Sequence, residues 1–101
     1  MANDDTDRRR TDEISLDELR EEIESIDREL VELIARRTYV ADTIAEVKEQ
    51  GDLPTTDEAQ EEAVIKRAVE NAEQFEVDSN IVRAIYRLLI ELNKVEQRES
   101  R

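Results

Sequence analysis

The longest apolar pattern in this 101-residue chain runs through residues 16–50, LDELREEIESIDRELVELIARRTYVADTIAEVKEQ. Apolar side chains recur there every three or four residues, the spacing of one face of an α-helix, at Leu16, Leu19, Ile23, Ile26, Leu30, Leu33, Val40, Ile44 and Val47. Ser15 can cap this helix, and Glu18 completes a capping box. Because no glycine or proline precedes Gly51, the pattern predicts one helix over residues 16–50.

Two shorter helices are predicted after it. Residues 51–56 hold the one glycine and the one proline of the chain, and this composition predicts a break. A threonine or the aspartate at positions 55–57 can cap a second helix over about residues 57–74, and residues 77–79 mark another stop and cap. A third helix follows over about residues 79–98. The predicted fold is therefore all-α, with a long, a short and a medium helix.

The chain is expected to contain one domain and a tail. Residues 1–13 show no periodicity and predict a flexible acidic tail, which leaves residues 14–101 for the helical domain. The excess of carboxylates is typical of cytosolic proteins from salt-loving organisms, in which counterions screen the repulsion between like charges. We therefore expect the fold to be more stable in molar KCl than in dilute buffer.

The composition excludes several functions. With 28 acidic and 15 basic residues, the formal charge is −13, which argues against binding nucleic acid because a duplex binder needs a basic face. The absence of cysteine and histidine excludes thiol chemistry, Ser-His triads and most transition-metal sites. No run of about 18 apolar residues could span a membrane, and residues 1–10 lack the apolar segment of a signal peptide. The expected location is the cytoplasm.

The first predicted helix is too long for its own chain to cover. At about 1.5 Å per residue it would extend roughly 50 Å, whereas a compact 100-residue monomer has a radius of gyration of about 13 Å. Soluble monomers rarely expose an apolar stripe of that size. The simplest cover is a second copy, which predicts an intertwined homodimer with antiparallel long helices. An ordinary coiled coil, or a helical hairpin docked on another protein, is the alternative.

Polar residues stand where the helical pattern asks for apolar ones. Arg37 continues the stripe past Leu33, and Lys48 follows three turns later, within about 20° of the same face. On the third helix Asn93 and Gln97 extend the stripe, and Glu61 lies in the first turns of the second helix. Each one alone is more often a register device or an exposed end. Together they predict a polar pocket with two cations, which suits a small carboxylate-bearing anion.

Arg20 adds a geometric constraint. It precedes Arg37 along the same helix by about 25 Å and points about 100° away from its face. It therefore cannot reach the same pocket within one chain. In an antiparallel dimer the start of one long helix lies beside the middle of the other, so Arg20 could enter the partner's pocket. Otherwise it is a solvated surface residue among acidic neighbours.

The layout resembles the all-α chorismate mutases of the shikimate pathway, which serve phenylalanine and tyrosine biosynthesis. The similarity covers the chain from Leu16 to Gln97. It rests on Leu19-Arg20-Glu21-Glu22-Ile23 with Ile26-Asp27, on Leu33-Ile34-Ala35-Arg36-Arg37, on Val47-Lys48, on Pro54 with Asp57 and Glu61, and on Asn93 with Gln97. The resemblance implies an intertwined dimer with two identical sites that rearranges chorismate to prephenate, an isomerase reaction, without any cofactor or metal.

The resemblance also implies a role for each site residue. Arg37 would hold one substrate carboxylate, and Arg20 of the other protomer would hold the second. Lys48 and Gln97 would donate to the ether oxygen of the breaking C–O bond, which becomes more negative in the transition state. Glu61 would accept a hydrogen bond from the ring hydroxyl.

The remaining positions line the same pocket or depart from the family's pattern. Asp57 would lie at the Glu61 end of the pocket, and Asn93 would contact a carboxylate region. Position 60 is Gln where the enterobacterial-type enzymes have Arg; if only the backbone N–H of Gln60 matters, little is lost, whereas a side-chain role would be weakened. Position 93 is Asn where those enzymes have Ser, and the amide can still donate.

Two other functions fit the same sequence. An isochorismate pyruvate-lyase would use a similar cationic pocket on the same scaffold. A non-catalytic helical dimerisation or regulatory module would need no pocket, and it predicts that leucine at Arg37, Lys48 and Gln97 costs no function. Identifying the products formed from chorismate and from isochorismate separates the three.

Overall fold

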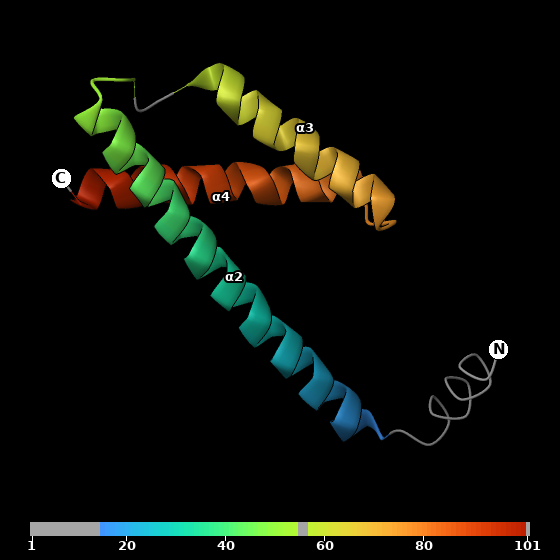
Figure 1. Ribbon diagram of the computed structural model, residues 1–101. Helices are drawn as coiled ribbons and strands as arrows, with labels where there is room; N and C mark the ends of the chain where they lie inside the picture. The colour runs from blue at the N-terminus through green and yellow to red at the C-terminus, as the bar shows by residue number, and fades with distance from the viewer. Residues whose placement is uncertain (1–14, 55–56, 101) are drawn as a thin grey trace. The chain divides into compact units, whose positions relative to one another are not determined.

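A computed structural model describes residues 15–54 and 57–100, with the backbone alone for residues 96–100. These residues form three α-helices and no strand: α2 (Leu16–Gln50), α3 (Glu58–Gln74) and α4 (Ser79–Ser100) (Figure 1). The predicted all-α order of long, short and medium helices is confirmed. The expected tail, residues 1–13, lies outside the described residues. None of these helices has an apolar stretch that could cross a bilayer.

Each helix begins at a side-chain cap. Ser15 Oγ accepts the backbone N–H of Glu18 at 3.2 Å before α2. Asp57 Oδ1 accepts the backbone N–H groups of Ala59 at 3.0 Å and Gln60 at 3.3 Å before α3. Asp78 Oδ1 accepts the N–H of Ile81 at 3.0 Å at the start of α4. These bonds satisfy N–H groups that a helix N-terminus leaves without an intrahelical partner, so the caps determine where the helices begin.

Helix α2 ends in a left-handed turn. The backbone N–H of Leu53 donates to Lys48 O and that of Asp52 to Glu49 O, and Asp52 has a left-handed φ of 60°. This is a Schellman motif, which usually has glycine at the left-handed position. Here Gly51 still belongs to the helical bonding pattern, since its N–H donates to Val47 O. Asp52, one residue after the glycine, therefore reverses the chain.

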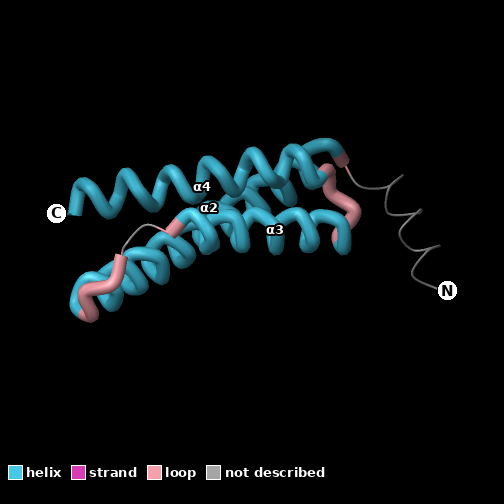
Figure 2. Tube along the Cα trace, turned by 90° about the horizontal axis from the view of Figure 1, so that it is seen from above, coloured by secondary structure: helices cyan, strands magenta, loops and turns pink. Residues whose placement is uncertain are grey.

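The described residues form two compact units, which divide within α2 between Leu33 and Ile34. In the second unit α3 and α4 pack as a hairpin closed by the short turn after Gln74 (Figure 2). Its core is small, with Ala45 of α2 and Ile65, Ala68 and Ala72 of α3 buried. In the first unit the apolar stripe of α2 is exposed, from Ile26 at 43% to Leu16 at 61%.

Candidate active site

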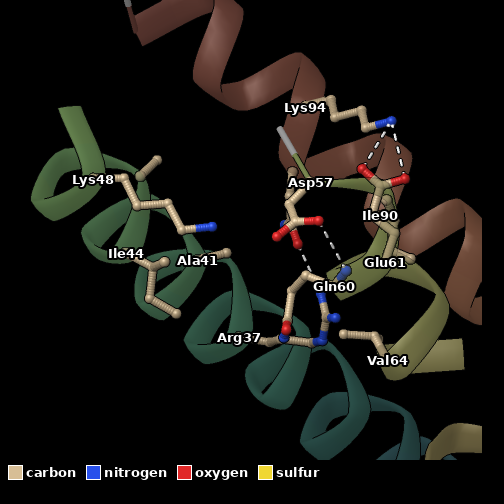
Figure 3. Close-up of a pocket in the computed structure, with 12 residues that line it drawn as sticks. Arg37, Ala41, Ile44, Lys48, Asp57, Gln60, Glu61, Val64, Ile90 and Lys94 are labelled. Carbon is tan, nitrogen blue, oxygen red and sulfur yellow. Dashed lines mark hydrogen bonds and ion pairs between the residues drawn. The ribbon is translucent and has the colours of Figure 1, made fainter. Parts of the chain in front are cut away.

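The second unit contains a pocket of about 490 Å³, a size suited to a small molecule. All three helices contribute to it. Its polar lining comprises Arg37 and Lys48 from α2, Asp57, Gln60 and Glu61 from the start of α3, and Asn93 and Lys94 from α4. Its apolar lining comprises Ala41, Ile44, Ala45, Val64 and Ile90. Figure 3 shows these side chains around the hollow.

Arg37 is held by two residues of α4. Its Nη1 donates to Asn93 Oδ1 at 2.7 Å, a short distance typical of a charge-assisted hydrogen bond. Its guanidinium carbon lies 5.6 Å from the centroid of the Tyr86 ring, within the range of a cation–π interaction. Arg37 itself is half-buried. A long and flexible cation is therefore restrained at the wall of the pocket before any ligand binds.

Lys48 lies three turns further along α2 and is also half-buried. Its ammonium faces the hollow in Figure 3. Because Lys48 lies in the last turn of α2, its charge is also favourable beside the carbonyl end of that helix. Two cations of one helix face therefore line one pocket.

The start of α3 supplies the acceptors. Asp57 Oδ1 caps the helix, while Gln60 and Glu61 lie in its first turn. Lys94 of α4 faces Glu61, with its Nζ 3.1 Å from Oε2 and 3.4 Å from Oε1. The exposed fractions of the two side chains are 37% and 29%. This ion pair balances the charge of Glu61, so the pocket lining keeps a net positive charge within an acidic chain.

The structure brings together most of the residues that the sequence predicted for the site: Arg37, Lys48, Asp57, Gln60, Glu61 and Asn93. Two other predicted residues are not among those that line the pocket. Arg20 is exposed in the first unit of the chain, and the side chain of Gln97 lies outside the described residues. The roles of all these residues in binding and catalysis stay predictions.

Sequence reasoning missed Lys94. Its spacing carried a usable signal, because Ile90, Lys94 and Gln97 follow one another at the i, i+4, i+7 intervals of a single helix face. A lysine near the end of a helix is nevertheless usually solvated. Only the approach of α3 to α4 shows that Lys94 lies opposite Glu61.

The comparison with known proteins agrees with this geometry. The sequence pattern of the family described as chorismate mutase type II matches residues 19–98. This chain belongs to that family. A relative named chorismate mutase, from Methanocaldococcus jannaschii, is 36% identical over 84 residues, which cover 83% of this chain and 85% of the relative. The predicted family, the all-helical fold and the activity of a chorismate mutase, an isomerase, are therefore confirmed.

Proposed function

We propose that the pocket between α2, α3 and α4 binds chorismate and rearranges it to prephenate, with Arg37 and Lys48 as its main cationic ligands. The observation that supports this proposal is the set of side chains around one hollow, in which cations of α2 face acceptors of α3. The substrate is a dianion that must fold before its new C–C bond can form. A pericyclic rearrangement needs no nucleophile and no proton shuttle, so binding geometry and electrostatics supply the catalysis.

The reaction breaks the ether C–O bond while a C–C bond forms between the enolpyruvyl methylene and the ring. Arg37 can pair bidentately with one carboxylate, because guanidinium and carboxylate match in geometry. Lys48 can serve the ether oxygen as a point charge that strengthens its interaction as that oxygen becomes more negative. Glu61, balanced by Lys94, can accept a hydrogen bond from the ring hydroxyl. We assign Gln97 the second donor to the ether oxygen.

We further propose that the protein works as a homodimer in which Arg20 of one protomer completes the pocket of the other. The support is the exposed stripe of α2 in the first unit, where Leu19, Ile23 and Leu30 are each about half exposed. Burying apolar surface stabilises a complex by about 25 cal/mol per Å², so an exposed apolar stripe favours a partner that covers it. Arg20 lies beside this stripe in the sequence, so a partner that covers the stripe also gains its guanidinium. We place the reaction in the cytoplasm.

The direct test uses purified protein with chorismate. We expect prephenate as the product, identified by mass spectrometry and by loss of the chorismate absorbance. The same protein with isochorismate tests for pyruvate release. Pyruvate as the main product, or no turnover of chorismate, would contradict the proposal.

A further inference from the structure

Asn93 is more deeply buried than a residue that only borders a pocket. Its exposed fraction is 7%, and among the described residues no other polar or charged residue is buried. A buried amide needs hydrogen-bond partners, because leaving its donors or acceptor unpaired is costly. Both ends of this amide have partners within the protein, and both partners are side chains of α2.

The chemistry of the partners determines which way the amide faces. Arginine has donors and no acceptor, so the amide oxygen, Oδ1, faces Arg37 at 2.7 Å. The amide nitrogen, Nδ2, then donates to Thr38 Oγ1 at 3.3 Å. A reversed amide would place two donors against each other at Arg37. Arg37 therefore selects the orientation of the amide, and Thr38, whose hydroxyl can donate or accept, holds the amide in place by accepting from Nδ2.

These contacts leave Asn93 with little to offer a substrate. Its oxygen is occupied by Arg37, and one of its two N–H groups is occupied by Thr38. Arg37, in contrast, has several N–H groups beyond the one that Asn93 receives. The guanidinium can therefore still bind a carboxylate while Asn93 and the ring of Tyr86 hold it in place.

We propose that Asn93 and Thr38 are positioning residues that orient Arg37 for a substrate carboxylate. The inference deepens the proposed function and rests on it for the identity of the substrate. It replaces the role in which Asn93 contacts the substrate carboxylate itself. Thr38 gains a role for which the sequence provides no signal, since it lies beside the apolar stripe and not in it.

The first test is Thr38→Val, which keeps the shape of the side chain and removes the acceptor. We expect kcat/KM for chorismate to fall about threefold to tenfold, the size of one net hydrogen bond. The matched control is Thr43→Val on the same helix, because Thr43 is exposed and its hydroxyl donates to Tyr39 O of its own helix. The control should retain the wild-type value. An unchanged kcat/KM in Thr38→Val would overturn the proposal.

A double-mutant cycle tests whether Asn93 acts through Arg37. Asn93→Ala should lower kcat/KM in the wild-type background and have no further effect once Arg37→Ala is present. An equal loss in both backgrounds would mean that Asn93 contacts the substrate directly. Asn80→Ala is the matched control, since Asn80 accepts from Arg83 Nη1 at 3.0 Å on the exposed surface of α4.

A third measurement does not depend on the reaction. In the free protein, the ¹⁵N relaxation of the Arg37 Nε–Hε group should report a restrained side chain, and Thr38→Val should release it while Thr43→Val does not. Equal order parameters in the three proteins would overturn the positioning role. If chorismate is not turned over but Arg37 is restrained and released as described, the proposed substrate is wrong and the positioning role stands.

Discussion

The two halves of α2 carry the same apolar repeat but have different surroundings. From Ile34 to Gln50 the helix buries Ala45 and places Arg37 and Lys48 beside residues of α3 and α4. From Leu16 to Leu33 the stripe lines no such pocket, although its exposure of 43–61% matches that of Val40, Ile44 and Val47 at 50–61% in the other half. A periodic stripe thus shows which face of a helix is to be covered, but it does not say whether the cover comes from the same chain.

The largest effect is expected in the half from Leu16 to Leu33. Leu30→Glu places a carboxylate in the centre of the stripe, where a partner copy would have to bury it without a counter-charge. We expect the dimer dissociation constant to rise about 10²–10³-fold and the activity to fall with it, measured by analytical ultracentrifugation and a chorismate assay. Ser25→Glu adds the same charge away from the stripe and should remain dimeric. A wild-type protein that sediments as a monomer would contradict the dimer.

The half that lines the pocket is tested by Lys48→Ala. Loss of one preorganised donor to a developing negative charge typically costs about 10²–10³ in turnover, and we expect a fall in kcat of that size. Lys66→Ala on α3 removes an exposed lysine and should leave kcat unchanged. Full activity in Lys48→Ala would mean that the cation acting on the ether oxygen has been assigned wrongly.

The ion pair between Lys94 and Glu61 should have a smaller effect. Lys94→Met removes the balancing charge, so Glu61 would repel the dianionic substrate across the pocket. We expect kcat/KM to fall about tenfold, as screened charges at such distances allow, and Lys94→Arg to restore most of it. Lys66→Met is the control for loss of a lysine charge. A tenfold loss that persists in a Glu61→Gln background would show that Lys94 acts independently of Glu61.

The last prediction joins the two halves. Arg20→Ala and Arg37→Ala should each have strongly reduced but measurable activity as homodimers. When the two proteins are unfolded together and refolded, about half of the dimers should be mixed, and each mixed dimer should have one complete site. About a quarter of the wild-type activity should then return, because one site in four has both arginines. Absence of any recovery would mean that Arg20 does not complete the partner's site.

Much of the fold could be predicted from local chemistry. The long helix begins after Ser15 and ends at Gln50 as the pattern and cap required, because these signals act within one turn. The reversal at Asp52 rather than at Gly51 could not be predicted. Either residue is compatible with the position in the sequence, and the choice depends on how far the helical bonding continues.

The site was predictable to the level of helix faces. Arg37, Lys48 and Asn93 interrupt an apolar stripe, and the three line one pocket. The partners of these residues depend on how neighbouring helices approach one another, which no periodicity encodes. The ion pair of Lys94 and the support that Thr38 gives to Asn93 therefore emerged only from the packed structure.

Asp57 links the architecture of the pocket to the thermodynamics of the fold. The same carboxylate that lines the cavity also accepts the first free N–H groups of α3. Replacing it with alanine would therefore lose a cap, about 1 kcal/mol of stability, and would also loosen the helix turn that presents Gln60 and Glu61. Changes in substrate preference at this end of the cavity cannot be made independently of the melting temperature, so variants here must be compared at equal fractions of folded protein.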